Sequence, residues 1–170
     1  MLSFVQALKL LKESCSENVV RHCLMVSEKS YELAGLIDSS GHVIDKELCR
    51  VGGLLHDIGR SLSHGVDHGV IGAKILIKHP ELSRIAKTHI GGGIGRAEAK
   101  ELGLGDEDLS PKTLEEKVVC YADKLVQDNK FVLDASEEIK KLKMKFGENH
   151  FSHKRLKVIE DEINKLIKKI

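Results

Sequence analysis

The chain has 170 residues, of which 41% are hydrophobic and two are proline, so its length suits one domain with a substantial helical core. Its net charge of +1 gives no reason to expect nucleic acid as a partner through a basic field. It has no recognisable signal peptide and no apolar run long enough to span a bilayer. We therefore expect a cytoplasmic protein with no membrane partner.

Apolar residues recur at helical spacing along the chain, whereas strand signals are scarce. The clearest breaks are the polar stretches 38–42 and 103–108. This pattern predicts an all-α fold, a single bundle of about seven to nine helices over residues 1–170. The predicted helices cover about residues 3–13, 17–37, 45–59, 68–79, 81–89, 95–102, 113–129, 134–145 and 151–169.

The last predicted helix carries an apolar stripe opposite its lysine and glutamate side chains. The stripe consists of Leu156, Ile159, Ile163, Leu166, Ile167 and Ile170. We expect the helices of 134–169 to pack on the rest of the domain, with pairing to a second copy as the alternative. The chain is thus expected to be a monomer or a homodimer. A lysine cluster on the preceding helix is predicted to be its solvated face: Lys140, Lys141, Lys143 and Lys145.

The cysteines show no paired spacing that would indicate a disulfide framework or a short zinc motif. Cys23, Cys49 and Cys120 fall within apolar helical patterns, whereas Cys15 does not. We expect reduced cysteines, the first three of them buried.

Two polar residues, His56 and Asp57, interrupt an apolar run that would otherwise be an ordinary buried helix. An unpaired ionised group in a low-dielectric interior costs several kcal/mol, or it shifts its pKa until it is neutral. A divalent metal ion would remove that cost. The pair therefore predicts a metal site if other ligands point inward elsewhere in the chain.

Four more potential ligands lie three or four residues from apolar neighbours on the same helical stripe. They are His22, His68, His89 and Asp123. Six nitrogen and oxygen donors at core-facing positions are explained more simply by a metal site than by six coincidences.

Each histidine also has a simpler interpretation, because one inward histidine is more often a hydrogen-bonded core residue than a ligand. Two inward acids without a positive partner on their own stripes change that interpretation, since lone buried aspartate is rare. His79 shares the periodicity but precedes Pro80, and a helix would place it roughly 16 Å from His68. It cannot share a metal with His68. Three further histidines lie in polar connecting stretches and are expected at the surface: His42, His150 and His153.

The ordered set of His22, the tetrapeptide His56-Asp57-Ile58-Gly59 and Asp123 resembles the HD superfamily of metal-dependent phosphohydrolases. Members carry the order H…HD…D and often the sequence HDIG. His68 and His89 resemble the extra ligands of the dinuclear branch, which includes HD-GYP cyclic-dinucleotide phosphodiesterases and bacterial HD-type diadenosine tetraphosphate hydrolases. The Gly-Tyr-Pro signature of the former is absent. The resemblance covers roughly residues 22–130 and places the metal-binding core at about 17–130.

The resemblance implies a first metal held by His22, His56, Asp57 and Asp123. It implies a second metal held by His68 and His89, with Asp57 bridging the two. Such a pair would clamp a phosphate and supply metal-activated hydroxide for in-line attack on phosphorus. Nitrogen and oxygen ligands of this kind leave Fe, Mn, Zn, Co, Ni or Mg open.

Four residues near the ligands are candidates for contact with substrate. Arg60 occupies a place where the family commonly has Lys or Arg, and its planar fork suits phosphate oxygens. Lys124 could contact phosphate or be a solvated neighbour, and Lys130 is a weaker candidate of the same kind. His64 could orient or protonate a leaving group. Asp67, in the same loop as His64, is better explained as a helix N-cap.

The glycine run 91–95 does not fit a nucleotide-binding loop, because no strand precedes it and neither phosphate-loop fingerprint matches. We expect it to end the helix after His89 and to form a flexible rim over the metals.

The resulting hypothesis is a metal-dependent phosphohydrolase that cleaves a phosphate ester or anhydride of a small nucleotide or nucleotide-like substrate. One alternative is a di-iron oxygenase of the same fold, and another is a non-catalytic nucleotide sensor. Arg60 suits an anionic substrate, which favours the phosphohydrolase over the oxygenase. The complete ligand set speaks against a non-catalytic sensor.

Overall fold

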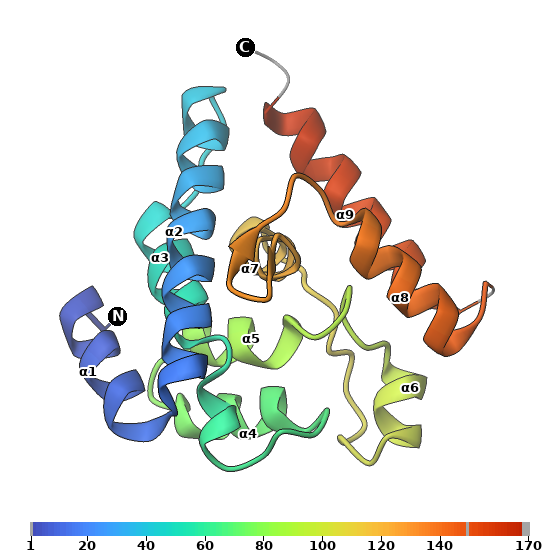
Figure 1. Cartoon of the computed structure of the whole chain (residues 1–170), viewed down its shortest axis with the longest axis horizontal. Helices are drawn as coiled ribbons and strands as arrows, with labels where there is room; N and C mark the ends of the chain where they lie inside the picture. Colours follow the sequence, from blue (N-terminus) through green and yellow to red (C-terminus); the bar gives the residue numbers. More distant parts are fainter. Residues whose placement is uncertain (1, 149, 168–170) are drawn as a thin grey trace.

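The computed structural model describes residues 2–148 and 150–167. Over these residues the chain forms nine α-helices, one short 3-10 helix and one small hairpin, which confirms the predicted all-α fold (Figure 1). The elements in chain order are α1 (Phe4–Ser14), α2 (Glu17–Ser39), α3 (Lys46–Leu55), η1 (Ile58–Ser61), α4 (His68–Ile75), α5 (Pro80–Thr88), α6 (Arg96–Glu101), α7 (Leu114–Lys124), β1 (Val126–Gln127), β2 (Lys130–Phe131), α8 (Ser136–Phe146) and α9 (Phe151–Ile167).

Several helices begin where a side chain satisfies the first unpaired backbone N–H groups. Ser3 accepts from the backbone N–H of Gln6, whose side chain in turn accepts from the Ser3 backbone N–H, so α1 starts with a capping box. Asp45 caps α3, Thr113 caps α7, and Pro80 occupies the first turn of α5. The signals at α3, α5 and α7 set the start of helices that contain a candidate ligand or end directly before one.

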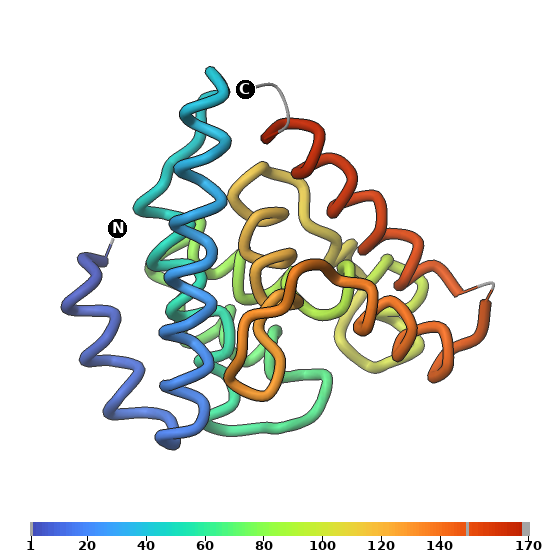
Figure 2. Tube along the Cα trace, turned by 45° about the horizontal axis from the view of Figure 1, so that its top comes forward, coloured from blue at the N-terminus to red at the C-terminus, as the bar shows by residue number. Residues whose placement is uncertain are grey.

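Two hydrophobic cores lie on either side of α2 and α3, which run side by side in both ribbon views (Figures 1 and 2). One core joins α1, α2, α3, η1 and α5 with Leu76 directly after α4, and it includes Leu54 and Leu55. The other joins α2, α7, α8 and α9, and it includes Leu156 and Ile163. Helix α7 belongs to the second core and also packs against α3 and α5, so its last turn lies in the interior of the fold.

The structure corrects three predicted helix ends. Helix α3 stops at Leu55, and the chain turns through His56 and Asp57 into η1 instead of continuing to residue 59. Helix α4 stops at Ile75, short of residue 79. Helix α7 stops at Lys124 and is followed by the hairpin β1–β2.

The hairpin turns through Asp128 and Asn129, whose φ angles are 50° and 56°. A two-residue turn with both φ angles positive matches the right-handed twist of paired strands, and Asp and Asn tolerate this conformation. The Asp-Asn pair was therefore the available signal for the hairpin within the predicted helix 113–129.

Helix α9 packs against α2, α7 and α8. The predicted continuation of this helix to residue 169, and Ile170 of its apolar stripe, lie outside the described residues. No helix in the described part of the chain is both long enough and apolar enough to cross a membrane. The four cysteines are free, and Cys23, Cys49 and Cys120 are buried, as predicted.

Candidate metal centre

Six side chains predicted as metal ligands meet in the interior of the fold. They come from five places in the chain: His22 on α2, His56 and Asp57 between α3 and η1, His68 at the start of α4, His89 at the end of α5, and Asp123 in the last turn of α7. Four of them are buried, namely His56, Asp57, His68 and His89. Convergence from such distant positions could not be read from spacing alone.

A first group of ligand atoms surrounds the carboxylate of Asp123. Its Oδ1 lies 3.0 Å from Nε2 of His22 and 3.4 Å from Nε2 of His56. The two imidazole rings lie 5.3 Å apart between centroids. Two nitrogens and one carboxylate oxygen thus point at a common space.

A second group surrounds Asp57. Its Oδ1 lies 3.0 Å from Nε2 of His68 and 3.4 Å from Nε2 of His89, whereas its Oδ2 lies 3.8 Å from Nε2 of His56. The two carboxylate oxygens of Asp57 therefore face the ligands of different groups. This is the arrangement that a bridging carboxylate requires.

Backbone carbonyls fix the orientation of three of the imidazoles. Because a carbonyl oxygen only accepts hydrogen bonds, each Nδ1 must carry the proton and donate it, which leaves the Nε2 lone pair of a neutral ring directed at the centre. These bonds run from His56 to Gly53 (2.7 Å), from His68 to Gly65 (2.6 Å) and from His89 to Ala86 (2.8 Å). Anchoring of the second ring nitrogen by a backbone carbonyl is typical of metal-binding histidines.

Polar atoms without partners indicate that the centre fits a cation. Within the described residues, Nε2 of His56 and Oδ1 of Asp57 are buried and have no hydrogen-bond partner. Nε2 of His68 lies 3.1 Å from Nε2 of His89, so two lone pairs face each other when both rings are neutral. A divalent cation would satisfy all of these atoms at once, because imidazole and carboxylate are its common ligands.

The electrostatic environment keeps the two carboxylates and His89 in the protonation states that bind metals. Burial lowers the pKa of His56, but the negative charge of Asp57 outweighs burial and raises that pKa well above its usual value while no cation is present. Burial raises the pKa of Asp57, but the imidazoles of His56, His68 and His89 more than offset this and hold its pKa well below the usual range. Burial likewise raises the pKa of Asp123, but Lys124 and the nearby imidazoles hold it well below the usual range. Burial lowers the pKa of His89 to about 4. At neutral pH the carboxylates are charged and His89 is neutral.

The two cations predicted to contact phosphate both lie against ligand carboxylates. Nε of Arg60 donates to Oδ2 of Asp57 at 2.5 Å, and Nζ of Lys124 forms an ion pair with Oδ2 of Asp123. Lys124 is nearly buried, and the charge of Asp123 raises its pKa against the opposing effect of burial. Lys130, in contrast, is exposed on β2 and lines neither of the two cavities beside the centre.

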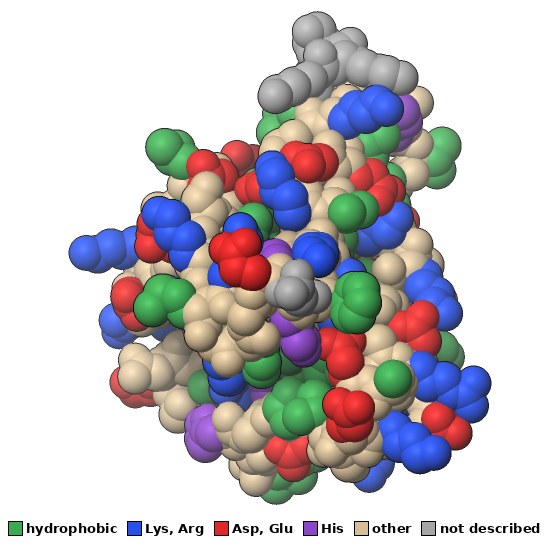
Figure 3. All heavy atoms as spheres, turned by 90° about the vertical axis from the view of Figure 1, so that its right-hand side faces the viewer, with side chains coloured by type: hydrophobic (Ala, Val, Ile, Leu, Met, Phe, Trp, Pro, Cys, Tyr) green, Lys and Arg blue, Asp and Glu red, His purple; other side chains and the backbone are tan. Residues whose placement is uncertain are grey.

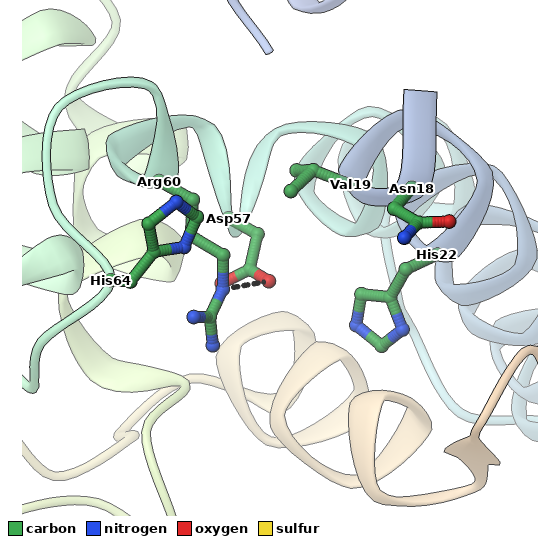
Figure 4. Close-up of a pocket in the computed structure, with 6 residues that line it drawn as sticks. All are labelled: Asn18, Val19, His22, Asp57, Arg60 and His64. Atoms are coloured by element: carbon green, nitrogen blue, oxygen red, sulfur yellow. Dashed lines mark hydrogen bonds and ion pairs between the residues drawn. The ribbon is translucent and has the colours of Figure 1, made fainter. Parts of the chain in front are cut away.

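A small cavity of about 300 Å³ opens on one side of the centre (Figure 4). Figure 4 shows Arg60 and His64 on one side of it and His22 with Asn18 on the other, with Asp57 between them. His64 therefore lies within the surroundings of the centre, and its role toward a leaving group stays a prediction. Asn18 was not predicted, because a polar residue in the first turn of α2 gives no signal at the level of sequence.

A larger cleft of about 650 Å³ opens on the other side. At its inner end lie Arg60, Lys124, Asp123, His68 and His89. Its outer walls come from α6, α8 and the start of α9. Figure 3 views the molecule from this side, and acidic and basic side chains are interspersed over the surface without forming one basic patch.

Comparison with known families identifies the fold that carries this centre. The model of the HD domain family matches residues 19–128. The chain belongs to the HD domain family. The match begins three residues before His22 and ends five residues after Asp123, so it spans all six candidate ligands.

Three relatives contain a segment similar to this HD domain, one as a chain of similar length and two as part of a longer protein. An uncharacterized protein of Methanocaldococcus jannaschii is 52% identical over 170 residues, covering 98% of this chain and all of the relative. A tRNA (cytidine(56)-2'-O)-methyltransferase of Picrophilus torridus is 37% identical over 155 residues, and a ribonuclease Y of Clostridium botulinum is 32% identical over 114 residues. The aligned segments cover 81% and 66% of this chain but 44% and 19% of those longer proteins. The named activities belong to those whole proteins.

A solved structure supports the same fold. The HD domain of the phosphodiesterase PgpH from L. monocytogenes, in complex with cyclic-di-AMP, superposes with a TM-score of 0.56 over 92% of each chain. The two sequences are 20% identical. At this identity the match describes the fold alone.

Two predictions about residues around the HD centre need correction. His153 is buried and not at the surface, because α9 starts at residue 151 and places His153 on the same face as Leu156. Asp67 stands at the N-cap position of α4 but makes no capping bond, since its Oδ1 instead accepts from the Ser63 hydroxyl at 2.6 Å.

The glycine run ends the segment after His89 and lines the large cleft at Gly91 and Gly93. Gly91 and Gly93 have φ angles of 61° and 91°, a conformation that favours glycine. Gly92 packs so closely on α9 that an added Cβ would lie 2.4 Å from the backbone nitrogen of Leu156. Arg155 donates to the carbonyl oxygen of Gly93 at 2.7 Å. The rim is thus held against α9.

Proposed function

We propose that this HD domain is a metal-dependent phosphohydrolase that cleaves a phosphate ester or anhydride of a small nucleotide or nucleotide-like molecule. The observation that carries the proposal is the convergence of six imidazole and carboxylate side chains, three of them anchored by backbone carbonyls, beside two cationic side chains at a centre that opens into two cavities. Ribonuclease Y and the PgpH phosphodiesterase, whose names describe cleavage of phosphodiesters, support the reaction class.

The residues of the centre would hold two ions. His22, His56 and Asp123 offer one set of ligand atoms, and His56, Asp57 and His89 offer another, each within 4.8 Å of one another. His68 would join the second set, since its Nε2 lies 3.0 Å from Asp57. We assign Asp57 as the bridging ligand because its two oxygens face both sets.

The chemistry divides between the ions and the protein. When bound, divalent ions clamp phosphate oxygens and supply a water of lowered pKa for attack on phosphorus. Arg60 gives one N–H to Asp57 and keeps the other N–H groups of its guanidinium for phosphate. Lys124 adds a second positive charge at the inner end of the large cleft. His64, which lines the small cavity beside Arg60, would protonate a leaving group.

A phosphate-release screen tests the proposal. Purified protein would be stripped of metal and reloaded in turn with Mn, Fe, Mg, Co, Ni and Zn, then offered mononucleotides, dinucleotides and cyclic dinucleotides. We expect turnover with at least one metal, and loss of that turnover in Asp57→Asn. Absence of turnover with every metal would contradict the proposal and favour the oxygenase or sensor alternatives.

A further inference from the structure

The outer end of the large cleft carries an aromatic pair. Phe146, the last residue of α8, stacks on the ring of His150 with 4.7 Å between centroids and 22° between planes. Both rings line the cleft, and Phe146 is 45% exposed. Phe131 and Phe151 are exposed as well, but neither of them lines this cleft.

Polar contacts hold this pair in place before any ligand arrives. Nε2 of His150 lies 3.4 Å from the carboxylate of Glu98, and the same carboxylate lies 2.7 Å from Nη2 of Arg155. Glu98 also accepts from the backbone N–H of Gly95. Helix α6, the glycine rim and α9 are therefore tied together behind the aromatic pair. Side chains that are already held in place lose little conformational entropy when a ligand binds, so such a preorganised surface binds at a small entropic cost.

The two ends of the cleft match the two parts of a nucleotide. The inner end holds Lys124 and the ligand set, which suit phosphate, whereas the outer end offers aromatic rings with Leu102 and Leu142 beside them, which suit a flat apolar group. Lys145 lies over the Phe146 ring at 5.0 Å from its centroid. Its side chain is exposed and flexible, so an incoming ring can displace it.

We propose that the Phe146–His150 pair is a subsite for the nucleobase of the substrate, with the phosphate at the metal centre. This inference rests on the proposed function, because it extends the same cleft. Stacking on a phenyl ring accepts any base, so the subsite distinguishes nucleotides from sugar phosphates and not one base from another. Larger purines gain more contact area than pyrimidines.

The test compares two ligands that differ by the base. The probes are adenosine 5'-monophosphate and ribose 5-phosphate, and dissociation constants are measured by calorimetry on the metal-loaded protein. We expect Phe146→Ala to weaken binding of the nucleotide on the order of 5- to 150-fold and to leave ribose 5-phosphate unchanged. Phe146→Trp should keep nucleotide binding. Phe151→Ala is the matched control, since Phe151 is exposed on the same helix pair but does not line the cleft.

The outcomes separate the subsite from the reaction. Equal binding of the two probes by wild-type protein, or equal losses for both in Phe146→Ala, would overturn the subsite even if phosphate release persists. Base-dependent binding without turnover of any nucleotide would support the subsite and contradict the proposed hydrolysis. Thermal unfolding of each variant checks that the fold is intact. Because Phe146 is exposed, its replacement should leave the fold unchanged, and a loss of binding confined to the nucleotide then reports on the base.

Discussion

The metal centre and the outer wall of the cleft are built by different means. The centre takes its ligands from helices packed in the two main cores, and backbone carbonyls anchor three of its imidazoles. The outer wall comes from α6, α8 and the start of α9, where polar links such as Glu98 with Arg155 join the elements. Helices α8 and α9 of the wall also pack in one of these cores, whereas the attachment of α6 and the glycine rim to α9 relies on a few side-chain bonds.

The largest expected effect concerns Asp57, which faces both ligand groups. We expect Asp57→Ala to lose metal at both positions, and elemental analysis after dialysis should show this directly. Asp67→Ala is a matched control, because that carboxylate is bonded to Ser63. Wild-type metal content in Asp57→Ala would mean that the centre is misplaced.

Removal of a candidate ligand from one group should cost one metal ion, which is half the loss expected for Asp57→Ala. We expect His68→Ala and His89→Ala each to lower the stoichiometry from two ions to one, and Asp123→Ala to empty mainly the other position. Titration with excess Mn followed by elemental analysis measures the ratio. Saturation of the wild-type protein at one ion would instead limit the centre to His22, His56, Asp57 and Asp123.

A smaller effect is expected for Arg60, which lines both cavities. Loss of a charge-assisted phosphate contact typically costs about 1.5–3 kcal/mol, or on the order of 10- to 150-fold in kcat/KM. Lysine at this position should restore only part of the rate, since a point charge cannot reproduce a bidentate fork. The assay uses metal-loaded enzyme and a nucleotide identified in the screen. Arg96→Ala, which removes an exposed ion pair with Asp106, serves as the control.

If Arg60→Ala retains full kcat/KM on every nucleotide that is turned over, Arg60 contributes only its bond to Asp57. Lys124 would then be the stronger candidate for neutralising phosphate.

The smallest effect should appear in the outer wall. Arg155→Met removes the bonds to Gly93 and Glu98 while keeping most of the side-chain volume. We expect a loss of about 1–2 kcal/mol of unfolding free energy, a few-fold rise in KM and unchanged metal content. Urea unfolding and steady-state kinetics measure these quantities, with Lys154→Met as control. A loss of metal in Arg155→Met would contradict the expectation that the outer wall can be weakened without affecting metal binding.

Four of the candidate ligands were predictable because each sits on a stripe with apolar neighbours three or four residues away, and His56 and Asp57 were predictable because they interrupt an apolar run. His22 and Asp123 follow this rule within long helices, and both point inward as expected. The exact path of the chain at His56 and Asp57 was not predictable, since helix α3 ends there and a 3-10 turn aims the two side chains at different groups. The loop between residues 61 and 68 was predictable only in part, because Asp67 bonds to Ser63 instead of capping α4.

The aromatic pair at Phe146 and His150 had no signal in the sequence. Both residues flank a turn between two helices, and polar neighbours made them resemble ordinary surface positions. Their place at the cleft follows from how α8 and α9 pack across α7 and from the ion pairs of Glu98.

The sequence by itself determined the helical class, the inward faces of the helices and the identity of the six candidate ligands, because helical periodicity is a local property that a few neighbouring residues reveal. Only the tertiary structure decided that these faces meet at one point, which ligands form which group, and which residues complete the cleft. Distances between helices depend on packing over both cores at once, so no single segment of the chain contains them.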